Sequence, residues 1–224
     1  NKQSVQLKID GYESPVDYLV ENEYLSQLEK ERLEIVSQEI SDADLKRINT
    51  RVSESMDVPV EILNILGFST TRNLQIIECV ERLVKDEGHT RILVFAPSVA
   101  SAIILSNICS YIGIGSSFVH SESKDRNLVI EDYKSGGEEP RVIFNYGVLS
   151  TGFDAPKTSA VIIARPTKSL VLLNQMAGRA IRGPKVEGTK FATLVTVVDI
   201  CIPELVETNK QFHAFDESWR LNNA

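Results

Sequence analysis

The sequence lacks a long hydrophobic run, since no stretch of its 224 residues approaches the roughly 18 apolar residues that span a membrane. Residues 1–10 contain no apolar segment typical of a secretory signal peptide. Cysteine is scarce: Cys79, Cys109 and Cys201 form no C-x-x-C pair, which argues against a disulfide framework or a zinc site. These absences predict a soluble protein in a reducing, cytoplasmic compartment, with Cys79 and Cys109 as small core residues.

The sequence also lacks nucleotide-binding motifs in their usual contexts. The stretch GPKVEGTK (183–190) approximates a phosphate-binding loop, but it follows an expected helix and precedes an expected strand, the reverse of what that loop needs. Asp86-Glu87-Gly88-His89 spells D-E-x-H, which binds magnesium in some nucleotide hydrolases only after a strand. Here it follows an amphipathic helix, so we interpret it as a helix end capped by Gly88. No G-x-G-x-x-G follows an expected strand, which argues against a dinucleotide-binding dehydrogenase.

Charge is unevenly distributed along the chain. Residues 1–61 carry 14 acids and 7 bases, whereas residues 62–224 carry 17 of each, so the net charge of -7 belongs to the first quarter. Residues 157–190 contain seven basic residues and one acidic residue, Glu187. The seven bases are Lys157, Arg165, Lys168, Arg179, Arg182, Lys185 and Lys190. Such a patch favours a polyanionic partner, although solubility alone would also explain it.

The apolar pattern changes near residue 90. Before it, we expect helices starting at Ser14–Pro15 and Ser41–Asp42, a strand within 32–40, and an amphipathic helix over 70–88. After it, short apolar strands alternate with helices, which indicates parallel strands buried on both faces. The expected strands are 91–96, 116–121, 140–145, 159–164 and 189–199, and the expected helices are 98–113, 123–136 (capped by Ser123) and 169–182.

This alternation predicts an α/β fold with three layers: an open, mostly parallel sheet over residues 90–200 with helices on both faces. We expect residues 1–89 to form a helical and irregular extension and residues 201–224 a helical tail. In such sheets, ligands bind beyond the carboxyl ends of the strands. Four polar segments are expected there: Pro97–Ser98, His120–Ser121, Asn145–Asp154 and Arg165–Ser169.

The stretch QMAGRAIRG (175–183) carries a glutamine and two arginines at helical spacing. Gln175 lies four residues before Arg179, and Arg182 three after it, so a continuous helix would place all three on one side. We expect Gly178 to let that side approach a neighbour closely. The alternative is a basic face exposed to solvent.

Three stretches occur in order on a matching strand–helix frame: RILVFAPSVASA (91–102), NYGVLSTGFDAPKTSAVIIARPTKS (145–169) and NQMAGRAIRG (174–183). Together they resemble motifs IV, V and VI of the second, C-terminal RecA-like lobe of superfamily 2 helicases. The amino-acid sequence of these motifs is most similar to that of RadD-type repair helicases and of the motor subunits of type I and type III restriction enzymes. The resemblance is strong over residues 90–200 and loose over 1–89, which would be the strap and helices that join two lobes.

The resemblance implies a role for each matching residue. Arg179 and Arg182, with Gln175 beside them, would face the ATP phosphates across a cleft, where a planar guanidinium neutralises the charge that develops on the γ-phosphoryl group. Asp154 would contact the nucleotide or orient an arginine, and Gly152 and Gly178 would shape the nucleotide side. The residues expected along a nucleic-acid backbone are Ser98, His120, Gly147, Val148, Thr151, Arg165, Thr167 and Ser169. Tyr146 departs from the threonine that many members carry.

The function that follows from the resemblance is that of the C-terminal lobe of an ATP-dependent DNA helicase or translocase. ATP and Mg2+ would be needed, with the phosphate-binding loop and the magnesium site supplied by an N-terminal lobe. Because the chain does not begin with methionine, we expect a fragment that is inactive by itself. Two alternatives stay open: an RNA-directed helicase of the same superfamily, and a non-catalytic lobe that binds nucleic acid or protein.

Overall fold

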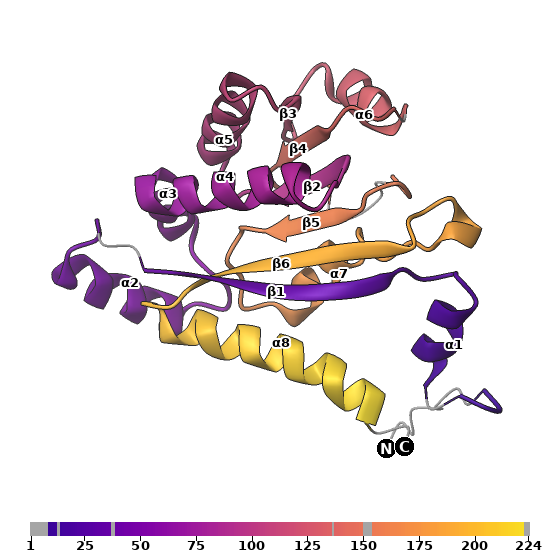
Figure 1. Cartoon of the computed structure of the whole chain (residues 1–224). Helices are drawn as coiled ribbons and strands as arrows, with labels where there is room; N and C mark the ends of the chain where they lie inside the picture. The colour runs from indigo at the N-terminus through magenta and orange to yellow at the C-terminus, as the bar shows by residue number, and fades with distance from the viewer. Residues whose placement is uncertain (1–8, 13, 37–38, 136, 150–153, 222–224) are drawn as a thin grey trace.

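The fold is built on one six-stranded sheet in which every pairing is parallel, in the order β1-β6-β5-β2-β4-β3 (Figure 1). A computed structural model describes residues 9–12, 14–36, 39–135, 137–149 and 154–221, with side chains up to residue 213. The strands are β1 (Gln27–Ile35), β2 (Arg91–Phe95), β3 (Ser116–Val119), β4 (Arg141–Asn145), β5 (Ala160–Ile163) and β6 (Phe191–Asp199). The expected open parallel α/β sheet is confirmed.

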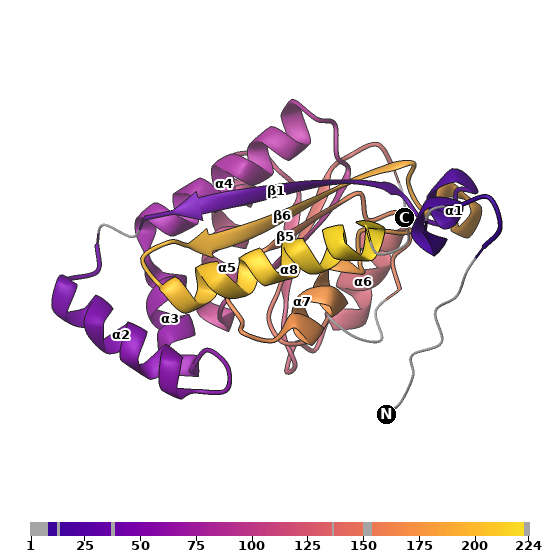
Figure 2. The same cartoon turned by 90° about the horizontal axis from the view of Figure 1, so that it is seen from below.

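Helices cover both faces of the sheet because its central strands are apolar on both sides. On one face, α4 (Thr70–Lys85) and α5 (Val99–Tyr111) bury residues such as Val80 and Leu105 against the sheet. On the other face lie α6 (Arg126–Lys134), α7 (Leu170–Ala177) and α8 (Pro203–Leu221), which contribute Tyr133, Met176 and Phe212 (Figure 2). Cys79 and Cys109 are buried in the core, as predicted. Among the described residues, no helix is long and apolar enough to cross a membrane.

The segment before residue 90 places helices near both ends of strands β1 and β6. The helix α1 (Pro15–Glu21) lies where β1 and β6 begin, while α2 (Asp42–Glu54) lies near their carboxyl ends (Figure 1 and Figure 2). A further helix, α3 (Val60–Phe68), was not predicted from the sequence. A separate apolar cluster joins α2 and α3 to the start of α8.

Several local expectations were wrong. The strand expected within 32–40 runs from Gln27 to Ile35, because its register is set by pairing with β6 along its whole length. Leu74, which the 3.6-residue period of the expected amphipathic helix places on its apolar face, is exposed, and the buried side of α4 begins at Arg72. Ser123 does not cap α6: its hydroxyl accepts a hydrogen bond from the His120 amide at 3.0 Å.

The largest departure concerns the helix expected over 169–182. The helix α7 ends at Ala177, and Gly178 is its C-cap. A tighter turn follows, in which the amides of Arg179 and Ala180 donate to the carbonyl groups of Met176 and Ala177 at 3.2 and 3.0 Å. Arg179 and Arg182 therefore lie beyond the helix, and the single helical face expected for them with Gln175 does not exist.

Candidate functional site

The two arginines lie where the strands of the sheet begin, called here the amino edge; the side where the strands end is called the carboxyl edge. The helix α7 starts after the carboxyl end of β5 and runs back toward the opposite edge, where Arg182 forms an antiparallel bridge with Leu25, two residues before β1. Asp154, between β4 and β5 in the chain, lies close to Arg182 at this same edge. Asp154 is thus separated from Gly147, although both had been expected at the carboxyl edge.

Asp154, Arg179 and Arg182 form a charged cluster, called here the arginine cluster. An Nη2 nitrogen of Arg182 lies 3.1 Å from a carboxylate oxygen of Asp154, and both side chains are substantially exposed. Partial burial and the neighbouring Arg182 lower the pKa of Arg179, while Asp154 opposes that shift. The two guanidinium groups thus lie close enough to influence each other, and such a pair of positive charges favours the approach of an anion.

Gln175 and Gly178 take no part in a close contact of the kind expected. Gln175 is exposed on α7. A Cβ added to Gly178 would come near only the backbone oxygens of Asn174 and Gln175, at 3.2 and 3.6 Å. Within this lobe Gly178 therefore admits no close neighbour from another element, and it stands at the C-cap of α7 with a right-handed φ of -59°.

The carboxyl edge carries the other group of candidate residues. The buried side chain of Asn145 donates to the carbonyl of Val94 at 3.0 Å, which fixes the start of the turn after β4. Gly147 follows in that turn with a φ of 73°, a conformation that favours glycine, and it is exposed. The guanidinium of Arg165 stacks 5.4 Å from the ring centre of Tyr146. The tyrosine that departs from the family pattern therefore supports an arginine at this edge.

Val148 and His120 are half-buried at the same edge. The His120 ring stacks on Phe118 with the ring centres 6.3 Å apart, and its Nδ1 accepts a hydrogen bond from the Glu122 amide at 3.3 Å. The two helix-start residues behave as caps: Ser98 and Ser169 each accept a hydrogen bond from the amide three residues on, in α5 and α7.

Ser98 and Thr167 are covered in this structure. Ser98 is 4% exposed, and a Cβ on Gly67 of α3 would lie 2.8 Å from its hydroxyl oxygen. Thr167 is also 4% exposed, and its hydroxyl donates to Asp57 at 2.8 Å. Neither side chain is open to a nucleic acid in this conformation. Thr151 and Gly152 lie outside the described residues.

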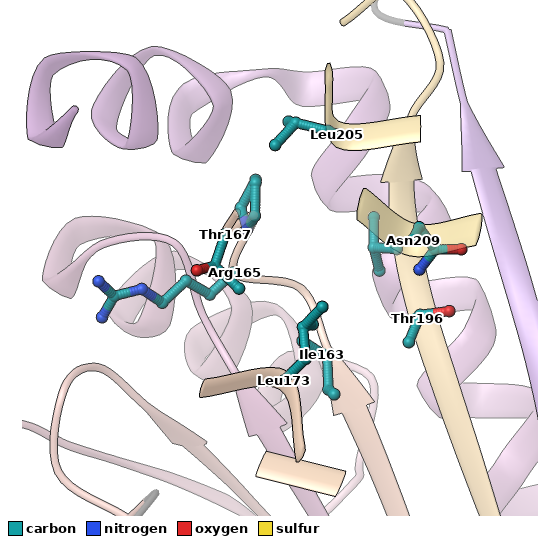
Figure 3. Close-up of a pocket in the computed structure, with 9 residues that line it drawn as sticks. Ile163, Arg165, Thr167, Leu173, Thr196, Leu205 and Asn209 are labelled. Carbon is teal, nitrogen blue, oxygen red and sulfur yellow. The ribbon is translucent and has the colours of Figure 1, made fainter. Parts of the chain in front are cut away.

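A cavity of about 20 Å³ lies between β5, β6, α7 and α8, lined by Thr196 and Asn209 among others (Figure 3). Figure 3 shows the Arg165 side chain extending away from these two residues. A volume of this size holds about one water molecule. The cavity is therefore far too small for a nucleotide.

The two misleading motifs have structural roles. The predicted helix end is confirmed, but the C-cap of α4 is Asp86; Gly88 follows two residues later with a φ of 73°, and the His89 amide donates to the Leu83 carbonyl at 2.9 Å. Glu87 pairs with Arg82. The 183–190 stretch is a turn with a short 3-10 helix, η1 (Pro184–Val186), leading into β6. Among the described residues, no group of three or more His, Cys, Asp or Glu side chains could hold a metal ion.

Three residues near the candidate site were missed from the sequence. Ser26 contacts the backbone of Arg182, Asp57 anchors the turn that holds Thr167, and Asp199 ends β6 in a fully buried pair with Arg72 at 2.9 Å. A carboxylate at the end of an apolar strand was a visible signal for Asp199. Ser26 and Asp57 gave none, because their partners lie more than a hundred residues away in the chain.

The fold and the site together define a class. An all-parallel open sheet with helices on both faces is the RecA-like fold of helicase C-terminal domains. Residues 75–184 match the family described as helicase conserved C-terminal domain. This part of the chain, just under half of it, resembles the C-terminal domain of helicases, and the sheet has the RecA-like fold of such domains.

The chain is similar to two curated proteins. It is 39% identical over 72 residues to the putative ATP-dependent helicase IRC3 of Saccharomyces cerevisiae, covering 31% of this chain and 10% of that protein. It is 24% identical over 179 residues to the 51.5 kDa protein of a Lactococcus phage (isolate 7-9), covering 77% of this chain and 37% of that protein. The chain therefore spans well under half of either relative.

Solved helicase structures share the fold. T4 UvsW superposes with a TM-score of 0.59 at 14% identity, over 85% of this chain and 40% of that one. The ATP-dependent Type ISP restriction-modification enzyme LlaBIII, solved bound to DNA, gives 0.54 at 17% identity, over 80% of this chain and 12% of that one. At these identities the likeness concerns the fold alone.

Proposed function

We propose that this lobe completes the ATP site of a DNA helicase or translocase, with Arg179 and Arg182 as the groups that act on the phosphates. The observation that carries the proposal is the arginine cluster, in which two guanidinium groups lie close to each other and to the carboxylate of Asp154. A γ-phosphoryl group that develops negative charge in the transition state is the kind of anion that such paired guanidinium groups stabilise.

The rest of the ATP site would come from a second lobe. That lobe would hold the phosphate-binding loop and Mg2+, which neutralises phosphate charge when bound. The described residues of this lobe contain no group of three or more His, Cys, Asp or Glu side chains that could hold a metal ion. Closure of the two lobes would bring the arginines to the phosphates, and reopening would follow product release. By itself the lobe holds half of each site, and we expect it to be inactive.

The carboxyl edge is the proposed nucleic-acid track. Gly147 is exposed there, with Val148 and His120 beside it and Arg165 held on Tyr146. A backbone amide beside an unhindered glycine and a guanidinium both suit phosphate oxygens, which carry no sequence information. Ser98 and Thr167 are left out of this track because α3 and Asp57 cover them. The two proposed sites lie at opposite edges of the sheet, joined by the segment from Asn145 to Asp154.

The test uses the full-length protein that contains this lobe. ATP turnover is measured without nucleic acid and with single-stranded DNA, double-stranded DNA or RNA, for the wild type and for Arg179→Ala. We expect stimulation by DNA and a loss of at least ~100-fold in turnover in the variant, the low side of what such an arginine contributes. Stimulation by RNA alone would instead assign an RNA-directed helicase.

A matched control is Arg47→Ala. Arg47 is an exposed arginine on α2 that pairs with Asp44 at 3.3 Å, within the same helix and away from the arginine cluster. Its removal should leave turnover within ~2-fold, since exposed pairs of this kind contribute little to stability. Unchanged turnover in Arg179→Ala would overturn the proposed role of the cluster.

A further inference from the structure

The backbone around Arg182 is held by the segment Glu23–Ser26, called here the clamp. The amide of Ser26 donates to the carbonyl of Ile181 at 3.2 Å, on one side of Arg182. On the other side, the Gly183 amide donates to the Tyr24 carbonyl at 3.0 Å. Leu25 forms the antiparallel bridge with Arg182 itself. The main chain of this arginine is thus fixed from both sides by a segment far away in sequence.

The Ser26 side chain adds a third constraint. It is 3% exposed, and its hydroxyl oxygen lies 2.7 Å from the carbonyl oxygens of both Arg182 and Thr189. The single hydroxyl proton of Ser26 is shared between the two carbonyl oxygens, and the Ser26 oxygen lies between them. The Thr189 amide also donates to the Arg182 carbonyl at 2.9 Å. Replacing this hydroxyl would remove the hydrogen bond shared by the Arg182 and Thr189 carbonyls, leaving the Arg182 carbonyl with the Thr189 amide as its remaining backbone donor.

Two glycines allow the clamp to come this close. A Cβ on Gly183 would overlap the carbonyl of Glu23, and a Cβ on Gly188 would overlap the carbonyl of Arg182. Both overlaps are with backbone atoms, which cannot rotate away as a side chain can. A side chain at either position would therefore separate the clamp from Arg182 or distort the turn.

The clamp is also tied to α1. The amides of Tyr24 and Leu25 donate to the carbonyl of Leu19 at 2.8 and 3.0 Å, and Lys185 lies over the Tyr24 ring, 4.8 Å from its centre. The helix α1, the clamp and the arginine turn thus form a continuous hydrogen-bonded unit at the amino edge. A displacement of α1 would be transmitted to Arg182.

We propose that Ser26 and the clamp are positioning elements for ATP hydrolysis, which set where Arg182 meets the phosphates. The inference rests on the proposed function, because it matters for catalysis only if Arg182 acts there. The side chain of Arg182 is held by Asp154 and its main chain by the clamp, so both halves of the residue are fixed. A shift of about 1 Å in such a group is enough to slow a reaction strongly.

The test is a double-mutant cycle in the full-length protein with DNA present. Turnover and the KM for ATP are measured for Ser26→Ala, Arg182→Ala and the double variant, with residual rates followed by radiolabelled ATP. We expect Ser26→Ala to lower kcat roughly fivefold with KM nearly unchanged, about what one lost hydrogen bond would give. In the Arg182→Ala background, removal of Ser26 should cost nothing further.

The matched control is Ser116→Ala in β3, the outermost strand on the side of the sheet opposite β1. The Ser116 hydroxyl also donates to a backbone carbonyl, that of Ser106, at 2.7 Å. Both serine variants should lower the melting temperature slightly, but only Ser26→Ala should lower kcat. Gly183→Ala provides a second variant, with an expected kcat loss larger than that of Ser26→Ala.

The outcomes separate the two proposals. If Arg182→Ala lowers kcat while Ser26→Ala and Gly183→Ala do not, or if Ser26→Ala costs the same in both backgrounds, the positioning role is overturned and the proposed function stands. If Arg182→Ala leaves kcat unchanged, the role of Arg182 is overturned together with the inference built on it. Loss of the Ser26 effect in the Arg182→Ala background supports the positioning role.

Discussion

At the scale of single residues, the molecule gives polar side chains different functions according to their burial. Arg182 pairs with Asp154 near the surface, and Arg179 is close enough to both for them to shift its pKa. Arg72 is fully buried, and its guanidinium is held by Asp199 and by the carbonyl of Ala164. An arginine thus joins α4 to the ends of β5 and β6 at position 72, whereas the arginines at positions 179 and 182 stay accessible. The residue type alone does not distinguish these two functions.

His89 illustrates how burial controls charge. Its Nδ1 and Nε2 lie 3.0 Å from the hydroxyl groups of Ser159 and Thr193, respectively. Burial lowers its pKa, although Glu87 acts in the opposite direction. The folded state therefore favours the neutral imidazole, and protonation favours the unfolded chain, whose histidine titrates near an ordinary pKa of about 6.5.

A pH dependence of stability follows for this residue. The contribution of His89 is fully present above about pH 6.5 and is lost as the pH falls from there toward the lowered folded-state pKa. Urea unfolding of the chain between pH 7.5 and 5 should show a falling free energy of unfolding. In His89→Gln, which cannot titrate, this component should be missing. An identical pH profile in the two proteins would contradict the assignment.

At the scale of elements, the sequence predicted which segments form the sheet better than where they end. Strands β2 to β6 were predicted because short apolar runs are easily recognised. The end of α7 was missed because helical spacing continues through residues 179–182, while Gly178 and the pairing with the clamp stop the helix. Tertiary pairing also moved β1 by several residues. Motif positions were therefore predictable, but the grouping of Asp154 with the arginines at one edge needed the structure.

The packing of α3 on α5 leads to a prediction at the same scale. A Cβ on Gly67 would lie 2.8 Å from the Ser98 hydroxyl and 3.1 Å from the Ser101 Cβ. Gly67→Val should push α3 away from α5 and lower the free energy of unfolding by about 1–3 kcal/mol, as overpacking does. Urea unfolding would measure the loss. Hydrogen exchange should also become faster in α3.

The control for that change lies on the same helix. Asn64 is on the exposed side of α3, and Asn64→Val introduces the same side chain without a close neighbour. It should change the free energy of unfolding by less than about 0.5 kcal/mol. Equal effects of the two valines would mean that helix propensity, rather than contact with Ser98, limits this position.

At the scale of the whole molecule, the sheet separates two surfaces. One edge carries the arginine cluster and its clamp, and the other carries the exposed Gly147 turn with Arg165. The helix α7 runs from one edge toward the other. In a two-lobe motor, this arrangement would let the nucleotide bound at one edge change nucleic-acid binding at the other. The coupling would pass through the elements that connect the two edges.

The central claim is that the arginine cluster acts on the transition state of ATP hydrolysis, and the most direct test compares binding of ADP with binding of ADP plus aluminium fluoride. Full-length wild-type protein and Arg179→Ala are titrated with each in the presence of Mg2+ and DNA. The account predicts that the variant binds ADP within ~3-fold of the wild type but binds ADP–aluminium fluoride at least ~100-fold more weakly, because only the transition-state mimic carries the charge that the arginine neutralises. Equal affinity of the two proteins for ADP–aluminium fluoride would contradict it.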